Sequence, residues 1–125
     1  MKYLIFTYGT LMKGQKRQHV MDKCRYIGDA ILDDYGLYEI GTYPAAVRMD
    51  GFKVYGEVYE VDEKVKKELD YIEDVGNLYN FVEVKVLLND EYVPVNFYEF
   101  IDKGVRYPIR KPEGKWNTIR NDIEA

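Results

Sequence analysis

Glu73 combines a titratable side chain with a position that disfavours its charge. Residues 62–74, DEKVKKELDYIED, have the apolar spacing of a helix, with Val65, Leu69 and Ile72 on the inner face. On a helical wheel Glu73 lies about 40° from Leu69, at the edge of that face, and in the last turn, where the helix dipole repels a carboxylate. Glu73 is therefore a candidate general base, although the position also fits a half-exposed glutamate at a fraying helix end.

A second candidate is the tetrapeptide Tyr8-Gly9-Thr10-Leu11, which follows the apolar residues 3–7, YLIFT. A glycine at the end of a buried strand lets the backbone approach a ligand closely. The N–H groups that follow can form a small anion nest for a carboxylate or a carbonyl oxygen. An ordinary glycine turn is the competing interpretation, and the tetrapeptide alone does not decide between them.

Several kinds of catalytic site are excluded by the residue types. The chain has no serine, one histidine (His19) and one cysteine (Cys24), so neither a serine triad nor a cysteine–histidine pair is credible. The same counts exclude a zinc site of several histidines or cysteines, and no acidic run has calcium-loop spacing. We therefore expect no metal and no cofactor, and the available chemistry is that of carboxylates, tyrosines and backbone amides.

The composition is typical of one water-soluble globular domain. The 125 residues are 46% apolar and 32% charged, which suits a domain with its own core over residues 1–125. The net charge of −4 argues against a nucleic-acid surface, and the basic run 13–17 is interpreted as a solvated helix face. No segment is long and apolar enough for a membrane helix or a signal peptide, so we expect no membrane partner and a cytoplasmic location.

The remaining pattern predicts mainly strands. Residues 3–7, 81–88 and 93–101 are predicted strands, the last two joined near Asn89-Asp90-Glu91. Residues 26–41 are interpreted as two short strands joined near Asp33-Asp34, and Asp50-Gly51 as a hairpin turn. Gly56, inside the strand 54–61, predicts a close approach of ligand or backbone, or a bend. Six or seven strands with one definite helix indicate the α+β class, with a mostly antiparallel or mixed sheet curled toward a barrel.

Together, these motifs resemble the γ-glutamylcyclotransferase-like superfamily, which includes the AIG2-like and γ-glutamylamine cyclotransferase proteins. The resemblance covers nearly the whole chain and depends on an ordered set of short motifs. They are Tyr8 to Leu11, Tyr43-Pro44-Ala45-Ala46-Val47, Val54 to Tyr59, Leu69 to Glu73, Tyr79, and Gly114-Lys115-Trp116. The implied fold is a small mixed β-barrel with short helices packed outside.

The resemblance also implies roles for residues. The residues Tyr8, Gly9, Thr10 and Leu11 would form the substrate-binding loop, largely through backbone groups, and Glu73 would be the catalytic acid/base. Tyr43 and Tyr98 are further candidates for binding substrate, with core or rim positions as the competing interpretation. Many family members have an arginine shortly after the tyrosine that matches Tyr79, whereas Asn80 and Phe81 follow here. This departure concerns the leaving group.

The implied activity is cofactor-independent, a C–N lyase formerly classed as an acyltransferase. The α-amine of a γ-glutamyl amino acid, amine or peptide attacks its own γ-carbonyl and releases 5-oxoproline. Because the substrate supplies the nucleophile, the protein needs no serine or cysteine of its own.

Two other functions remain open from the sequence. The chain could be a non-catalytic relative that binds a small metabolite in the same site. It could also be an enzyme that removes a γ-glutamyl group from a biosynthetic intermediate or a modified protein. The expected partner is a small γ-glutamyl molecule, and the chain is expected to be a monomer or a homodimer.

Overall fold

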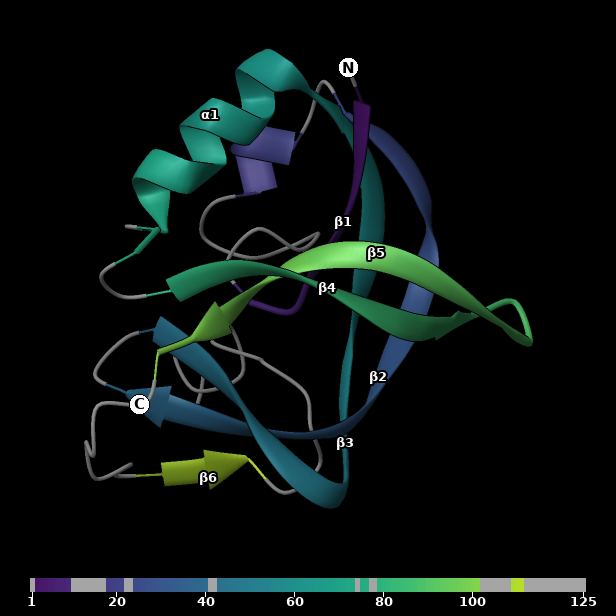
Figure 1. Ribbon diagram of the computed structural model, residues 1–125, viewed down its shortest axis with the longest axis vertical. Coiled ribbons are helices and arrows are strands. Elements are labelled where there is room, and N and C mark those ends of the chain that lie inside the picture. The colour runs from purple at the N-terminus through teal and green to yellow at the C-terminus, as the bar shows by residue number, and fades with distance from the viewer. Residues whose placement is uncertain are drawn as a thin grey trace.

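In the part of the chain that the structure describes, five strands close into a barrel and a helix lies outside it (Figure 1). The computed structural model describes residues 2–9, 18–21, 24–40, 43–73, 75–76, 79–101 and 109–111. The elements are β1 (Lys2–Thr7), a 3₁₀ turn (Gln18–Met21), β2 (Arg25–Ile40), β3 (Tyr43–Asp62), α1 (Glu63–Ile72), β4 (Tyr79–Leu88), β5 (Glu91–Phe100) and β6 (Ile109–Lys111).

The strand order is β3-β1-β5-β4-β2-β6, and an additional pairing of β2 with β3 closes the ring of the first five. Only β1 and β5 run parallel among these pairings, so the barrel is mixed and mostly antiparallel. The predicted fold class is confirmed. Among the described residues, no helix is long and apolar enough to cross a membrane.

Alternation along the strands divides the core into two layers. The inner cluster, which includes Phe6, Tyr8, Val54 and Phe97, draws on every strand of the closed ring and fills the barrel. The outer cluster lies between the barrel and α1, and Leu69 is its fully buried helix residue. Because side chains alternate across a strand, residues next to each other in sequence serve different layers.

The predicted helix and the second predicted hairpin are both confirmed. Asp62 is the N-cap of α1, and its Oδ1 accepts a hydrogen bond from the Val65 N–H at 2.8 Å. The turn between β4 and β5 consists of Asn89 and Asp90, whose φ angles of 49° and 66° suit a tight hairpin.

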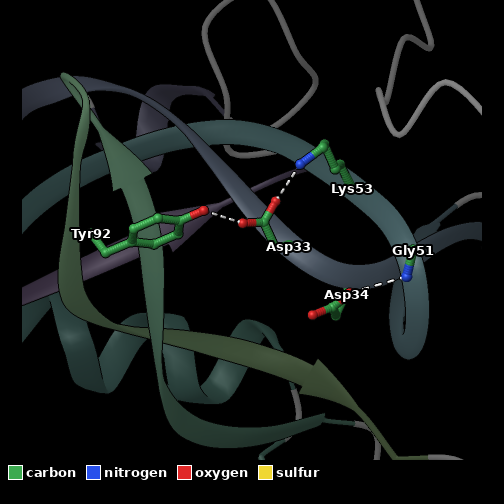
Figure 2. Close-up of polar contacts among 5 residues, drawn as sticks. All are labelled: Asp33, Asp34, Gly51, Lys53 and Tyr92. Atoms are coloured by element: carbon green, nitrogen blue, oxygen red, sulfur yellow. Dashed lines mark hydrogen bonds and ion pairs between the residues drawn. The ribbon is translucent and has the colours of Figure 1, made fainter.

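The predicted interruptions of residues 26–41 and 43–62 are wrong. Each range is a single long strand in the structure, and both halves of β3 pair with β2. The register jumps from Asp33↔Lys53 to Tyr35↔Arg48, so both strands bend at the same point. Asp34 and Gly51 have φ angles of 62° and 86°, and the Gly51 N–H donates to Asp34 Oδ1 at 3.0 Å (Figure 2). The turn residues therefore produce a bulged corner rather than a chain reversal.

Gly56 marks a close approach of two backbones, as its position inside a strand predicts. A Cβ atom at Gly56 would lie 2.3 Å from the carbonyl oxygen of Thr7 and 2.7 Å from Cζ of Phe6. The absence of a side chain therefore lets the end of β1 lie directly against β3. This approach places the segment Tyr8-Gly9 at the end of the barrel.

Candidate active site

Glu73 is the C-cap residue of α1, with φ −85° and ψ −1°. Its N–H donates to the carbonyl oxygen of Leu69 at 2.9 Å, which holds the residue in the helical turn. The residue is half-buried, whereas Tyr71 two positions earlier is 87% exposed. Glu73 thus lies at the edge of the face that Leu69 buries, where the helical wheel predicts it.

Tyr8 and Gly9 are both buried immediately after β1. The Tyr8 hydroxyl donates to the carbonyl oxygen of Tyr98 at 2.8 Å and accepts from the Ala46 N–H at 3.4 Å. Burial raises the pKa of Tyr8 well above its usual value, and the charges of Tyr79 and Glu73 raise it further. The hydroxyl therefore remains protonated and joins the end of β1 to β5 and β3.

Tyr98 is held at both ends by polar contacts. Its carbonyl accepts from Tyr8, and its buried hydroxyl donates to Asp70 Oδ1 at 2.8 Å. The other carboxylate oxygen of Asp70 lies 2.6 Å from Lys66 Nζ, which also lies 4.5 Å from the centre of the Phe81 ring. Burial, the hydrogen bond to Asp70 and the Glu73 charge together raise the pKa of Tyr98.

Tyr8 and Tyr98 are joined by a hydrogen bond, and the charge of Glu73 acts on the hydroxyls of both. The Glu73 carboxylate raises the pKa of both hydroxyls, so it lies within electrostatic range of each. The last turn of α1, the start of β4 and the end of β5 lie on the same side of the barrel (Figure 1). A half-buried carboxylate within electrostatic range of two protonated phenols is suited to exchange a proton with a bound molecule.

The structure describes no side chain for three of the predicted binding residues, Thr10, Leu11 and Tyr43. Thr10 and Leu11 lie outside the described residues, as do residues 114–116. Tyr43 is the first residue of β3, and its side chain also lies outside what the structure describes.

Sequence reasoning missed two groups of polar residues beside this site. The first is the Lys66–Asp70 pair that anchors Tyr98. The second is Glu99, whose Oε2 accepts a hydrogen bond from the Tyr35 hydroxyl at 2.6 Å. The sequence could have indicated Glu99. Side chains alternate along β5, Val95 and Phe97 face the inner cluster, and Glu99 is the next residue on the same side. In the described part of the chain, no group of three His, Cys, Asp or Glu residues could hold a metal ion.

Comparison with known proteins gives a family match over most of the chain. The family model described as "Gamma-glutamyl cyclotransferase, AIG2-like" matches residues 5–118. The gamma-glutamylcyclotransferase family protein YtfP of Escherichia coli K12 is 41% identical over 75 residues, 60% of this chain and 66% of that protein. A gamma-glutamylaminecyclotransferase of Bos taurus is 30% identical over 106 residues, 77% of this chain and 63% of that protein. The chain thus spans just under two thirds of the length of these curated relatives.

Solved structures have the same fold. An uncharacterized protein of Pyrococcus horikoshii has a TM-score of 0.77 at 28% identity, over 98% of this chain and 96% of its own. An AIG2-like protein of Mus musculus has a TM-score of 0.85 at 23% identity, over 94% of this chain and 90% of its own. At that lower identity the likeness concerns the fold alone.

Proposed function

Because the chain belongs to the AIG2-like γ-glutamylcyclotransferase family, we propose that it releases 5-oxoproline from a γ-glutamyl amino acid, amine or peptide. The observation that carries this proposal is the half-buried Glu73 carboxylate at the end of α1, within electrostatic range of the hydroxyls of Tyr8 and Tyr98. The proposed substrate supplies its own nucleophile, so the chemistry requires one proton-transfer group and a surface that bends the substrate.

In the proposed reaction, Glu73 takes a proton from the α-ammonium of the substrate. The free amine attacks the γ-carbonyl, a C–N bond closes the five-membered ring, and the bond to the leaving nitrogen breaks. Glu73 then returns its proton to that nitrogen, and the second proton that the ring nitrogen loses leaves with the amine as an ammonium, so the protein ends the cycle unchanged. General acid–base catalysis of this kind contributes about 10²- to 10⁴-fold to the rate.

Positioning accounts for the rest of the proposed catalysis. Ring closure is intramolecular, so holding the substrate bent brings amine and carbonyl together without a second encounter. Backbone N–H groups of the segment that begins at Tyr8-Gly9 would bind the α-carboxylate or the developing oxyanion. The hydrogen bonds of Tyr8 to β5 and β3 support this, because they fix the start of the segment relative to Tyr98.

The deciding experiment compares 5-oxoproline release by wild type, Glu73→Gln and Glu68→Gln on γ-glutamyl amino acids, γ-glutamyl amines and glutathione. Glu68 is an exposed residue of the same helix, so its variant controls for the loss of a negative charge from α1. We expect Glu73→Gln to lose at least about 10²-fold in kcat and Glu68→Gln to match wild type.

Two results would contradict the proposal. Turnover by Glu73→Gln at the wild-type rate would remove Glu73 from the mechanism. Binding of 5-oxoproline by wild type without turnover of any substrate would assign the site to a metabolite-binding relative instead.

A further inference from the structure

Glu99 places a carboxylate at the end of the barrel next to the proposed active site. β1 and β5 pair in parallel at Ile5↔Asn96 and Phe6↔Phe97. Tyr8 follows Phe6 by two residues, and Glu99 follows Phe97 by two residues. Both therefore lie on the side of the inner cluster, to which Phe6 and Phe97 belong. On this side of β5, Glu99 is therefore the first residue beyond the aromatic side chains of the barrel interior, level with the end of β1.

The Glu99 carboxylate has a fixed hydrogen-bond donor and, among the residues that the structure describes, no ion-pair partner. The Tyr35 hydroxyl donates to Oε2 at 2.6 Å, and the Tyr35 ring packs edge-on against Phe97 with centroids 5.2 Å apart. Arg48 lies over the Tyr35 ring, with Cζ 5.9 Å from its centroid. Within the described ranges, no lysine or arginine forms an ion pair with Glu99. One oxygen of this half-buried carboxylate thus holds Tyr35, and the other remains able to accept further hydrogen bonds.

The charges of Glu73 and Glu99 act on the same hydroxyl, that of Tyr8, from different elements. Each of them raises the pKa of Tyr8, one from the end of α1 and the other from β5. The proposed ring closure needs a single acid/base, because the same group takes and returns the proton. The second carboxylate is therefore available for binding.

We propose that Glu99 binds the leaving-group end of the substrate and selects leaving groups that carry a positive charge, such as a diamine; this inference rests on the proposed function. A half-buried carboxylate interacts with a cation more strongly than an exposed one does, because less water screens the pair. Arg48 lies beside Tyr35 and offers the opposite charge, but it is more exposed than Glu99, so water screens its charge more strongly. The arrangement therefore favours an ammonium over a carboxylate on the leaving group.

Three matched substrates test the charge of the leaving group. They are γ-glutamyl derivatives of 1,4-diaminobutane, pentylamine and 5-aminopentanoate, which share four methylenes and end in an ammonium, a methyl group and a carboxylate. We expect wild type to prefer the diamine derivative over the pentylamine derivative by roughly fivefold to tenfold in kcat/KM, mostly through KM. In Glu99→Gln, whose amide oxygen can still accept from Tyr35, this ratio should fall to about one. Glu91→Gln, at the exposed opposite end of β5, should keep the wild-type ratio.

A binding measurement distinguishes failure of this inference from failure of the proposed function. The dissociation constants of the three derivatives are measured by titration calorimetry in Glu73→Gln, with and without Glu99→Gln. Tighter binding of the diamine derivative, lost on adding Glu99→Gln, supports the inference whether or not wild type turns these compounds over.

Three results overturn the inference. The first is equal binding, or no binding, of all three derivatives. The second is a preference for the carboxylate derivative that Arg48→Gln removes, since it would assign selection to Arg48. The third is an equal, large loss of turnover in Glu99→Gln for charged and neutral leaving groups, since it would make Glu99 part of the proton transfer or of the fold.

Discussion

At the scale of single residues, the candidate site depends on side chains that are held by others. Tyr98 is fixed by Asp70 through its hydroxyl and by Tyr8 through its carbonyl, while Lys66 in turn fixes Asp70. Each of these polar groups has a hydrogen-bond or ion-pair partner within the protein, so none is left unsatisfied where it is shielded from water. The protein's own contacts therefore hold these side chains in place.

The close contact at Gly56 leads to the first residue-scale prediction. In Gly56→Ala, the added Cβ meets the Thr7 carbonyl, a backbone atom that cannot move aside cheaply. We expect the free energy of unfolding to fall by about 2 kcal/mol or more, measured by urea denaturation.

Gly28→Ala is the matched control for this contact. A Cβ at Gly28 would also be close, at 2.8 Å, but it would meet Cδ1 of Leu88, the far end of a flexible side chain. The cost should therefore be smaller than at Gly56. Equal costs for the two variants would mean that the approach of Thr7 to Gly56 does not limit packing.

At the scale of elements, α1 was predictable because its signals are local. The N-cap, the apolar spacing and the position of Glu73 all lie within residues 62–73 and need no distant partner. The bent strands β2 and β3 were not predictable in this way. Asp-Gly marks a turn in sequence, but whether the chain reverses or only bends depends on which strand each half pairs with.

The N-cap of α1 gives a prediction at this scale. Asp62→Ala removes the hydrogen bond to the Val65 N–H and should lower the free energy of unfolding by about 1 kcal/mol. Asp62→Asn keeps an acceptor at the same place and should stay close to wild type in urea denaturation. A loss in Asp62→Asn as large as in Asp62→Ala would show that the charge, rather than the cap, stabilises the helix.

At the scale of the whole molecule, the closed ring has a narrow seam between β2 and β4, which pair at Ile31↔Leu87. Asp33 on β2 adds side-chain links near this seam, because it accepts hydrogen bonds from Lys53 on β3 and from Tyr92 on β5 (Figure 2). Three strands are thus joined through one carboxylate beside the bulged corner of β2 and β3.

These links make the stability of the barrel depend on pH. The hydrogen bonds from Lys53 and Tyr92 lower the pKa of Asp33 in the folded protein below its usual value. The stabilisation is therefore fully present above about pH 4, the usual value for an unfolded aspartate, and is lost as the pH falls through the lowered pKa. Asp33→Asn should have a lower urea midpoint than wild type at pH 7.

The same comparison at lower pH completes this prediction. The difference between wild type and Asp33→Asn should shrink as the pH falls below about 4. Asp50→Asn, which removes an exposed carboxylate from the same corner, should show no such convergence. A difference between wild type and Asp33→Asn that stays constant with pH would exclude the ionised carboxylate as its source.

The amino-acid sequence was enough to predict the local features of this protein: the helix and its cap, the β4–β5 turn, the strand before Tyr8-Gly9 and the candidate Glu73. These depend on residues a few positions apart, whose propensities and spacing act without a distant partner. Only the tertiary structure decided that residues 26–41 and 43–62 are continuous strands and that the sheet closes. It also decided that Asp70, Glu99 and Tyr35 gather near Tyr8 and Tyr98. The reason is that these contacts join residues far apart in the chain, and strand pairing and burial, rather than local sequence, select them.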